Sequence, residues 1–310
     1  MTNLTLPIFT DPDKARAHLE ALHWPNGPIC PHCGVVNEAT LVKGKSHRPG
    51  MYQCNACREP FSVTVRTVME KSHIPLNKWV LGFHLMAASK KGISAHQLHR
   101  MLGITYKSAW FMAHRIREAM APGADAGPMG GEGKIVETDE TEISPSRKSR
   151  PRKRSQNMKI VSLIERGGRV RSRNITKLDR SMTRTVRAVV KQELDPASRL
   201  HTDGAVWYAM QPPLAAKHES VDHSKGEYVR YPFDGEPVHS NSAEGYFSIF
   251  KRGLVATYQI MSEQHLHRYL AEFDFRMSTR TRLVVNDEMR AARAIMGATG
   301  KRLTYYTVTG

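Results

Sequence analysis

Three acidic residues in the second half of the chain are candidates for one metal site. Asp139 lies in the run VETDE, Asp203 in the run HTDG and Glu244 in the run HSNSAE. The first run is typical of a strand, the second of a strand end and the third of the first turn of a helix. Carboxylates from separate elements can converge on divalent metal ions and promote phosphodiester chemistry. The sequence therefore predicts a metal site built from these three side chains.

The strand patterns indicate where two of these carboxylates point. Alternation along the first strand puts Glu137 and Asp139 on one face and Glu140 on the other. Asp203 ends a strand before Gly204, and a carboxylate at a strand end faces the crevice where α/β sheets bind ligands. Alternatively, Asp203 caps the helix that follows, and the two roles are compatible. We expect Asp139 to line the site with Glu137 as its neighbour.

The third candidate lies on a predicted helix with two distinct faces. At about 100° per residue, Asn241, Glu244, Ser248 and Lys251 fall on one side. The opposite side is expected to join the core, and it holds Ala243, Tyr246, Phe247 and Phe250. The polar side is then aimed at the sheet, although spaced charges also occur on solvated helix surfaces. The two aspartates elsewhere in the chain favour the first interpretation.

The four cysteines form a second candidate metal site. Cys30 and Cys33 make one C-x2-C pair, Cys54 and Cys57 make another, and 20 residues separate the pairs. This spacing is typical of a ribbon in which four thiolates hold a structural Zn²⁺. Metal binding would supply folding free energy that such a small ribbon lacks. Four unrelated thiols and an iron–sulfur cluster are the alternatives.

Residues 94–110 contain two helical runs separated by a glycine turn, a pattern typical of a helix-turn-helix. Ser94 and Thr105 are the predicted caps of the two helices. The second run offers Tyr106, Lys107, His114, Arg115 and Arg117, and we expect Tyr106, Lys107 and Arg115 to contact DNA. A purely structural helical hairpin is the alternative.

The chain is strongly basic, with a net charge of +17 and a pI of about 9.9. This charge favours a polyanionic partner, because cationic side chains that contact phosphates release condensed counterions. A basic ribosomal or membrane-surface protein is the alternative. One basic run is predicted to be an exposed loop that adds DNA contacts, and it comprises Arg147, Lys148, Arg150, Arg152, Lys153 and Arg154.

No targeting or membrane pattern is present in the sequence. The first seven residues lack the basic start and apolar run of a signal peptide. No stretch approaches the roughly 18 uninterrupted apolar residues of a membrane helix. Because the cysteines are grouped as metal ligands, a reducing compartment is favoured. We therefore expect a soluble, cytoplasmic protein without a membrane partner.

Composition and periodicity divide the chain into segments. Residues 122–133 are rich in Gly, Ala and Pro and are predicted to be a linker, and an α/β pattern follows them. The predicted segments are an N-terminal helix (1–24), a zinc ribbon (25–66), a helix-turn-helix region (72–121), the linker, an α/β domain (134–285) and a C-terminal tail (286–310). In the α/β domain we predict strands at 134–143, 157–166, 169–175, 199–203 and 218–222, and helices at 181–193, 241–252 and 262–278.

The ordered motifs resemble the prokaryotic insertion-sequence transposases that join a zinc ribbon to an RNase H-like DDE catalytic domain. The resemblance covers nearly all of the chain. It runs from LHWPNGPICPHCG (22–34) through ETDET (137–141), HTD (201–203), VDHSKGEYV (221–229) and HSNSAE (239–244) to LHRYLAEFDFR (266–276). Each motif alone is weak, whereas their order is specific.

This resemblance implies an RNase H-like mixed sheet in residues 134–285 and two Mg²⁺ or Mn²⁺ ions held by Asp139, Asp203 and Glu244. One metal would activate the attacking water or 3′-hydroxyl, and the other would stabilise the leaving oxygen. Some relatives emphasise an Asn and a Lys around the third acidic residue, which match Asn241 and Lys251 here. The third catalytic residue is therefore either Glu244 or Asn241.

We accordingly expect a DNA transposase that cleaves DNA strands and transfers them to a target. Its ribbon and helix-turn-helix would bind double-stranded DNA at the inverted-repeat ends of an insertion sequence, within a homo-oligomeric transposition complex. One alternative is a DNA-binding regulator derived from a transposase, although the presence of all three acids argues against it. The other is a structure-selective nuclease on the same fold, which would hydrolyse strands without joining them.

Overall fold

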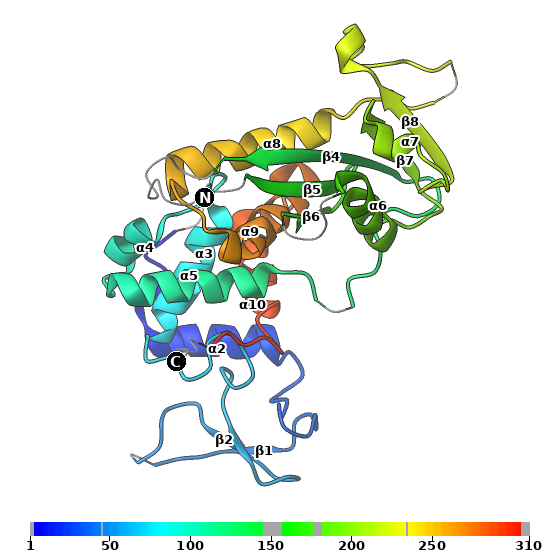
Figure 1. Cartoon of the computed structure of the whole chain (residues 1–310). Coiled ribbons are helices and arrows are strands. Elements are labelled where there is room, and N and C mark those ends of the chain that lie inside the picture. Colours follow the sequence, from blue (N-terminus) through cyan, green and yellow to red (C-terminus); the bar gives the residue numbers. More distant parts are fainter. Residues whose placement is uncertain are drawn as a thin grey trace, which may run out of the picture. The chain divides into compact units, whose positions relative to one another are not determined.

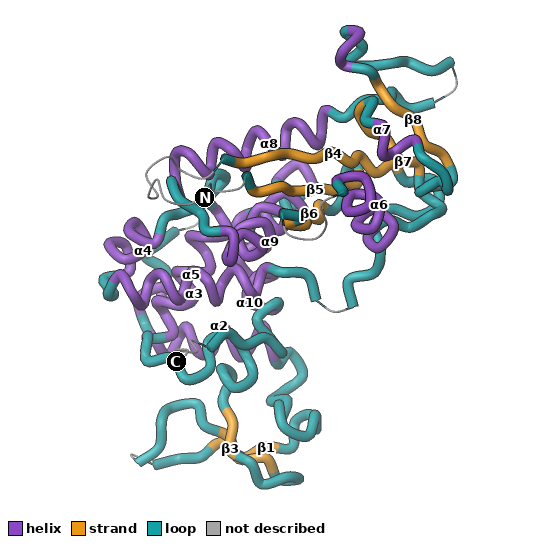
Figure 2. Tube along the Cα trace, in the orientation of Figure 1, coloured by secondary structure: helices purple, strands orange, loops and turns teal. Residues whose placement is uncertain are grey.

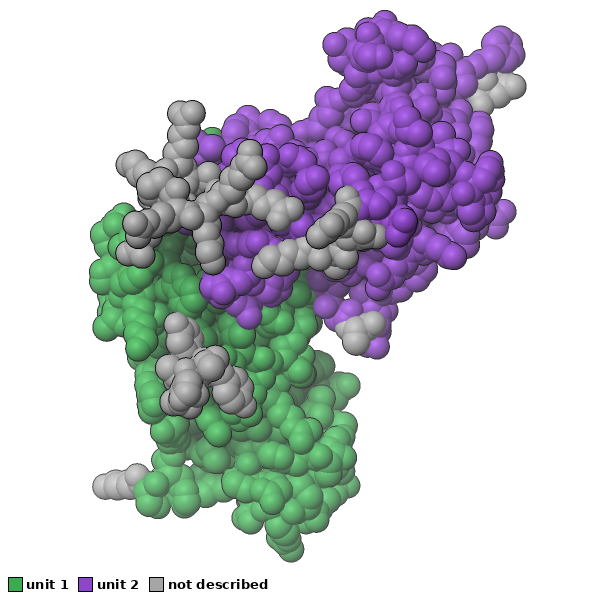
Figure 3. Space-filling model, in the orientation of Figure 1, with its two compact units in different colours: residues 1–121, 285–310 green, residues 122–284 purple. Residues whose placement is uncertain are grey.

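The computed structural model describes residues 3–44, 46–123, 125–144, 157–176, 181–233 and 235–304. The chain forms two compact units, shown in different colours in Figure 3. Unit 1 comprises residues 1–121 and 285–310, and unit 2 comprises residues 122–284. The basic run at 147–154, predicted to be a DNA-contacting loop, lies outside the described residues. None of the helices in the described ranges is long and apolar enough to span a membrane.

A small ribbon of three antiparallel strands forms one part of unit 1. Its strands are β1 (Ala39–Leu41), β2 (Tyr52–Cys54) and β3 (Pro60–Phe61), in that order. The rings of Tyr52 and Phe61 stack with their centroids 5.8 Å apart, and Trp24 meets both rings edge-on. Cys30 and Cys54 belong to the same apolar cluster. Because strands this short bury little surface, the predicted ribbon needs metal ligation to be stable.

Helices form the rest of unit 1. They are α1 (Pro7–Thr10), α2 (Pro12–His23), α3 (Leu76–Ala88), α4 (Ala95–Leu102), α5 (Tyr106–Met120) and α10 (Asp287–Met296). The Asp11 carboxylate caps α2 by accepting from the backbone N–H of Asp13 at 2.7 Å. At the centre lies α3, which buries Trp79, Phe83 and Met86 and packs against α2, α5 and α10.

The predicted helical hairpin is confirmed in α4 and α5. The hydroxyl of Ser94 accepts from the N–H of Gln97, and that of Thr105 accepts from the N–H of Ser108, each at 3.2 Å. Both predicted caps are therefore present. Gly103 ends α4 with a φ of 57°, a left-handed conformation that glycine adopts without a Cβ clash. This turn sets the second helix against the first.

The C-terminal segment returns to unit 1. Helix α10 packs against α3, α2 and α5, and Thr299 forms a β-bridge with Thr67. The Lys301 ammonium donates to the carbonyls of Ala119 at 3.3 Å and Ala121 at 2.5 Å, at the end of α5. A cation is favourable there because the helix dipole is negative at its C-terminus. The segment predicted as a C-terminal tail thus contributes, in its described part, helix α10 and an extended stretch that packs on unit 1.

Unit 2 is built on a mixed five-stranded sheet. Its strands are β4 (Ile135–Ile143), β5 (Met158–Glu165), β6 (Val170–Asn174), β7 (Arg199–Asp203) and β8 (Lys217–Val221), in the order β6-β5-β4-β7-β8. The pairs β4–β5 and β5–β6 are antiparallel, whereas β4–β7 and β7–β8 are parallel. An antiparallel three-strand meander followed by two parallel strands is the predicted RNase H-like arrangement, so the predicted strands and fold class are confirmed.

Helices cover both faces of this sheet (Figure 2). One face packs against α8 (Asn241–Gly253) and α9 (Leu266–Ser278), which contribute Tyr246, Phe250 and Phe273 to the core. The other face packs against α6 (Met182–Glu193) and α7 (Val206–Ala209). Figure 1 shows α8 lying along β4 and running in the same direction. The two elements that carry Asp139 and Glu244 are therefore neighbours.

Candidate active site and zinc site

The strand register brings Asp139 and Asp203 together. In the parallel pair β4–β7, Glu137 lies opposite His201, so two residues further along each strand stand Asp139 and Asp203. Strand β7 ends at Asp203, while β4 continues to Ile143. The carboxylates of Asp139, Glu140 and Asp203 each offer an oxygen, and these oxygens lie within 4.8 Å of one another. Two of the three predicted acids thus meet at the edge where β7 stops.

Glu140 belongs to this group although strand alternation predicted its side chain on the face of β4 opposite Asp139. Its side chain leaves β4 toward α7, where the Tyr208 hydroxyl donates to Glu140 Oε2 at 2.6 Å. One of its carboxylate oxygens nevertheless lies within 4.8 Å of oxygens of Asp139 and Asp203. The sequence signal for this role of Glu140 was its position next to Asp139, whereas strand alternation predicted that its side chain lies on the opposite face.

Helix α8 forms the second wall of the site. A cleft of about 490 Å³ lies between residues of β4 and α8, and it is lined by Asp139, Glu140, Thr141, Glu244, Phe247, Ser248, Lys251 and Arg252. The predicted polar face of α8 therefore faces the cleft through Glu244, Ser248 and Lys251. Glu244 Oε1 lies 3.6 Å from Nδ1 of His223. Among the described residues, Glu244 lies outside the close carboxylate group but shares its cleft.

Asn241 is placed differently from Glu244. It is the first residue of α8 and is exposed, and its backbone N–H donates to Nδ1 of His239 at 3.3 Å. It is not among the described residues that line the cleft. Of the two candidates for the third catalytic position, Glu244 is therefore the one that the structure brings to Asp139.

The crowded carboxylates perturb one another. Burial, followed by the negative charges of Asp203 and Glu244, raises the pKa of the Asp139 carboxyl to about 6. Burial likewise raises the pKa of Glu140 to about 7, against the opposing effect of the Tyr208 hydrogen bond. Partly buried carboxylates held this close repel one another, and a divalent cation would relieve that repulsion. An all-oxygen donor set suits Mg²⁺ or Mn²⁺, so these residues fit the implied metals.

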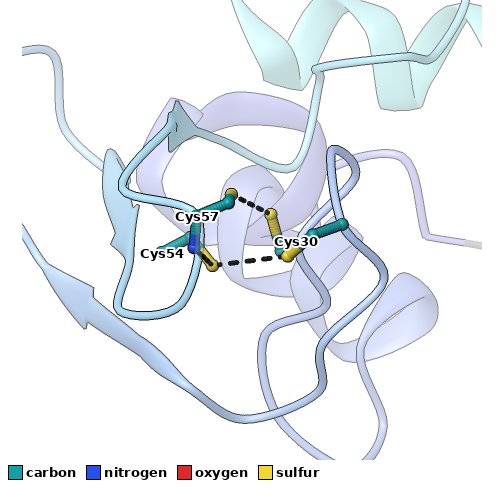
Figure 4. A group of neighbouring side chains, drawn as sticks. Cys30, Cys54 and Cys57 are labelled. Atoms are coloured by element: carbon teal, nitrogen blue, oxygen red, sulfur yellow. Dashed lines mark hydrogen bonds between the residues drawn. The ribbon is translucent and has the colours of Figure 1, made fainter.

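The four cysteines converge as predicted (Figure 4). Their sulfur atoms lie within 4.8 Å of one another, with 3.7 Å between Sγ of Cys30 and Cys57 and 3.7 Å between Sγ of Cys33 and Cys54. A tetrahedral Zn²⁺ site with bonds of about 2.3 Å has sulfur–sulfur edges of about 3.8 Å. The Cys57 N–H, which donates to Cys54 Sγ, lowers the pKa of that thiol to about 7 and favours the thiolate. The group therefore fits structural zinc.

The predicted DNA-contacting residues of α5 separate into two kinds. Tyr106 and Lys107 are exposed in the first turn of α5, and the Tyr106 ring stacks on His96 with centroids 4.2 Å apart. Arg115 instead donates to the carbonyls of Leu303 at 3.2 Å and Glu70 at 3.1 Å. Its guanidinium is thus committed to contacts inside unit 1. Only the first turn of α5 offers the exposed side chains that a recognition helix needs.

Both units match families of known proteins. Residues 126–278 match the ISXO2-like transposase domain, and residues 10–59 match the transposase zinc-ribbon domain. A protein of Halobacterium salinarum, described as an uncharacterized protein in transposable element ISH50, is 26% identical over 288 residues. That similarity covers 87% of this chain and 93% of the Halobacterium protein. The similarity therefore extends through both units, and the matched ranges span the four cysteines and the three acids of this chain.

Proposed function

The chain belongs to the insertion-sequence transposases that join a zinc ribbon to a DDE transposase domain, and we propose from this premise that it cleaves DNA at the ends of an insertion sequence and transfers the cut strands to a target. The observation that carries the proposal is the cleft between β4 and α8. Asp139 lines one wall of the cleft with the Asp203 carboxylate close beside it, and Glu244 and Lys251 line the other wall. Acids and a cation around one open cleft suit a phosphodiester backbone.

The chain's own residues would divide the work of binding and orientation. Asp139, Asp203 and Glu244 would hold two Mg²⁺ or Mn²⁺ ions. When bound, such ions activate an attacking oxygen and stabilise the leaving oxygen of an in-line displacement. Lys251 and Arg252, which line the same cleft, would bind the phosphates that flank the scissile bond. The positive charges of Lys251 and Arg252 would direct the DNA strand into the cleft.

Glu140 would have a supporting role in this arrangement. Its hydrogen bond from Tyr208, a residue that is 1% exposed, fixes one carboxylate oxygen. The other oxygen remains available toward Asp139 and Asp203. Glu140 would thus add a third negative charge for a metal beside the two aspartates, or accept the proton of an attacking hydroxyl.

Recognition of the DNA ends is assigned to unit 1. Tyr106 and Lys107 at the start of α5 would enter the major groove, because the first residues of a recognition helix reach the base edges. The zinc ribbon would add contacts to the backbone. The basic run at 147–154 would add further phosphate contacts that carry little sequence information. Pairing of two ends would require a homo-oligomer of this chain in the transposition complex.

A strand-transfer assay tests this proposal. A labelled, pre-cut duplex that carries the element's end is incubated with the full chain, Mg²⁺ and supercoiled target DNA. The proposal expects joined products, and the Asp139→Ala variant, in which they should be absent, serves as the control. Cleavage without joining would instead identify a structure-selective nuclease. End binding without either reaction would identify a DNA-binding regulator.

A further inference from the structure

A buried polar layer lies directly beneath the proposed active site. Glu137 is 0% exposed and His201 is 0% exposed, and both lie in the sheet. Each precedes a proposed metal ligand by two residues: Glu137 precedes Asp139, and His201 precedes Asp203. Ser242 also lies two residues before Glu244, on helix α8. Side chains two residues apart on a strand share a face, so this layer lies under the carboxylates.

Glu137 ties this layer to helix α8. Its Oε2 accepts from the backbone N–H groups of Ser242 at 2.7 Å and Ala243 at 3.3 Å. Its Oε1 accepts from the Ser242 hydroxyl at 3.0 Å. Both amides belong to the first turn of α8, where N–H groups commonly lack a helical partner, and the Ala243 N–H also donates to the carbonyl of Ser240 at 3.0 Å. A carboxylate from β4 thus caps a helix that lies more than 100 residues further along the chain.

Besides Glu137, the described side chain that accepts from an N–H at the start of α8 is that of His239, whose Nδ1 accepts from the N–H of Asn241 at 3.3 Å. Within the described part of the chain, the side chain of its N-cap residue, Ser240, makes no capping hydrogen bond. An anionic cap also interacts favourably with the positive end of the helix dipole. The start of α8 is therefore fixed to β4 by Glu137.

Arg166 joins the remaining parts of the layer. Its Nε donates to Glu137 Oε1 at 2.7 Å, which also balances the buried negative charge. Its Nη1 donates to the carbonyl of Pro237 at 2.7 Å, and its Nη2 donates to the carbonyl of His239 at 3.2 Å. The same Nη2 lies 3.3 Å from Nδ1 of His201 on β7. One guanidinium thus connects β4, β7 and the segment that leads into α8.

The distances along the two elements show what this attachment controls. From Glu137, Asp139 lies two residues further along β4, or about 6.6 Å at about 3.3 Å per residue. From the capped first turn, Glu244 follows within about 3 Å along α8 at about 1.5 Å per residue. Because α8 lies along β4 in the same direction, fixing the first turn also fixes which side chains face Asp139.

We propose that Glu137, Arg166, His201 and Ser242 form a positioning layer that holds α8 in register with β4 and β7, so that Glu244 meets Asp139 and Asp203 at the metal site. The inference rests on the proposed function, because it concerns the geometry of the same site. None of the four residues needs to touch DNA or metal. Glu137, His201 and Ser242 act through the ligands that follow them by two residues, and Arg166 acts by joining Glu137 to His201 and to the segment before α8.

The test uses the full-length, zinc-loaded chain and the variant Glu137→Gln. The variant keeps the side chain's shape but removes the charge and one acceptor oxygen, so the side chain can no longer accept from both Arg166 and the first turn of α8. Mn²⁺ binding is measured by calorimetry, and hydrogen exchange is measured at residues 242–244. Loss of a partner behind a metal ligand commonly lowers metal affinity by about 10- to 100-fold. We expect that loss of Mn²⁺ affinity, faster exchange at the first turn and unchanged affinity for DNA ends.

A matched control separates positioning from general destabilisation. Glu193 is a similarly buried carboxylate of unit 2, and it pairs with Arg171 at 2.6 Å far from α8 in the sequence. Glu193→Gln should leave Mn²⁺ affinity within about twofold of the wild type. Ser242→Ala, which keeps the backbone bond to Glu137, should cause a smaller loss than Glu137→Gln. Should Glu137→Gln fail to fold, Arg166→Lys keeps the charge while removing the fork that joins β7, and the same loss of Mn²⁺ affinity is expected.

Two results would overturn the inference, and they differ from failure of the proposed function. Unchanged Mn²⁺ affinity in Glu137→Gln would show that the layer does not position the ligands. An equal loss in Glu193→Gln would show that any buried charge in unit 2 has the same effect. If the wild-type chain itself binds no Mn²⁺, the metal site of the proposed function is wrong, and the layer has no ligands to position.

Discussion

The two candidate metal sites of this protein are built on opposite principles. The cysteine site takes its ligands from two short knuckles, each with two cysteines only three residues apart, and sulfur contacts of 3.7 Å join one knuckle to the other. The carboxylate site takes its ligands from β4, β7 and α8, which meet only when the sheet and its helix are assembled. A site of the first kind can stabilise a ribbon that has little core. A site of the second kind depends on the fold around it, so it is sensitive to distant packing.

The strongest way to separate the two sites is to remove one of the two neighbouring aspartates, Asp139 or Asp203. Asp139→Ala or Asp203→Ala should lower cleavage by more than the roughly 100-fold that loss of a supporting partner costs. Binding to the element's ends should change little, since it is assigned to unit 1. Single-turnover cleavage and a gel-shift assay measure the two properties. Glu142→Ala, an exposed carboxylate on the same strand, is the matched control. Near-normal cleavage by either aspartate variant would refute the site.

The third position can be resolved by comparing two residues of α8. We expect Glu244→Gln to slow cleavage by about 100-fold and Asn241→Ala by less than about tenfold. A carboxylate brings charge to a hard cation, and only Glu244 lines the cleft. Rates are compared at matched protein and Mg²⁺ concentrations, and Mn²⁺ should rescue Glu244→Gln only partly. An inactive Asn241→Ala beside an active Glu244→Gln would make the asparagine the third catalytic residue.

Loss of one zinc ligand should weaken binding to DNA ends and leave metal binding at the carboxylate site intact. Cys30→Ser should lower the zinc content well below one ion per chain and weaken specific binding to DNA ends. Mn²⁺ binding at the carboxylate site should persist, because unit 2 has its own core. Elemental analysis and calorimetry on the full chain measure both metals. A zinc content in the wild type far below one per chain would argue against the ribbon, and loss of Mn²⁺ binding in the variant would show that the two sites depend on each other.

Proton competition should mark the carboxylate site. The pKa of Asp139 is raised to about 6 and that of Glu140 to about 7 in the metal-free protein. Since a metal binds the deprotonated carboxylates, Mn²⁺ affinity should fall as the pH is lowered through 7 and then 6. The folding stability of the metal-free protein should show the opposite pH dependence. Carboxyl groups with raised pKa values bind protons more tightly when folded, so they stabilise the fold below about pH 4 and lose that contribution as the pH rises through 6 to 7.

Calorimetric titration with Mn²⁺ at several pH values between 5 and 8 measures this competition. Thermal unfolding of the metal-free chain over the same range measures the opposite trend. The Asp139→Ala variant should show a flatter pH dependence of stability. Equal Mn²⁺ affinity at pH 5 and pH 8 would contradict the raised pKa values.

The smallest expected effect concerns the first turn of α5. Lys107→Ala should lower the slope of log K against log salt by about 0.9, the value for one phosphate contact. Arg115→Ala should leave the slope unchanged and instead lower the thermal stability of the chain, because Arg115 bonds to Leu303 and Glu70. Binding titrations over a range of salt concentrations distinguish the two. A fixed slope in Lys107→Ala would remove that residue from the DNA surface.

The helix-turn-helix and the sheet show how far local patterns reach. Ser94 and Thr105 cap their helices as predicted, because a cap is a bond between residues only three apart. The strands of unit 2 also follow their predicted ranges, because apolar periodicity is local. Arg115 differs, because its partners Leu303 and Glu70 are far away in the sequence and no pattern around α5 predicts these contacts. Its interior role follows from the return of the C-terminal segment to unit 1.

The amino-acid sequence by itself determined the grouping of the four cysteines, the order of strands and helices along the chain, and the acids proposed for the site. These features depend on spacing, periodicity and residue type, all of which are local. Only the tertiary structure decided that Glu140 joins the carboxylate group and that Glu244, rather than Asn241, lines the cleft. It also decided that Glu137 caps α8. Such relations depend on strand register and on how a helix lies across a sheet, which arise only when distant segments pack together.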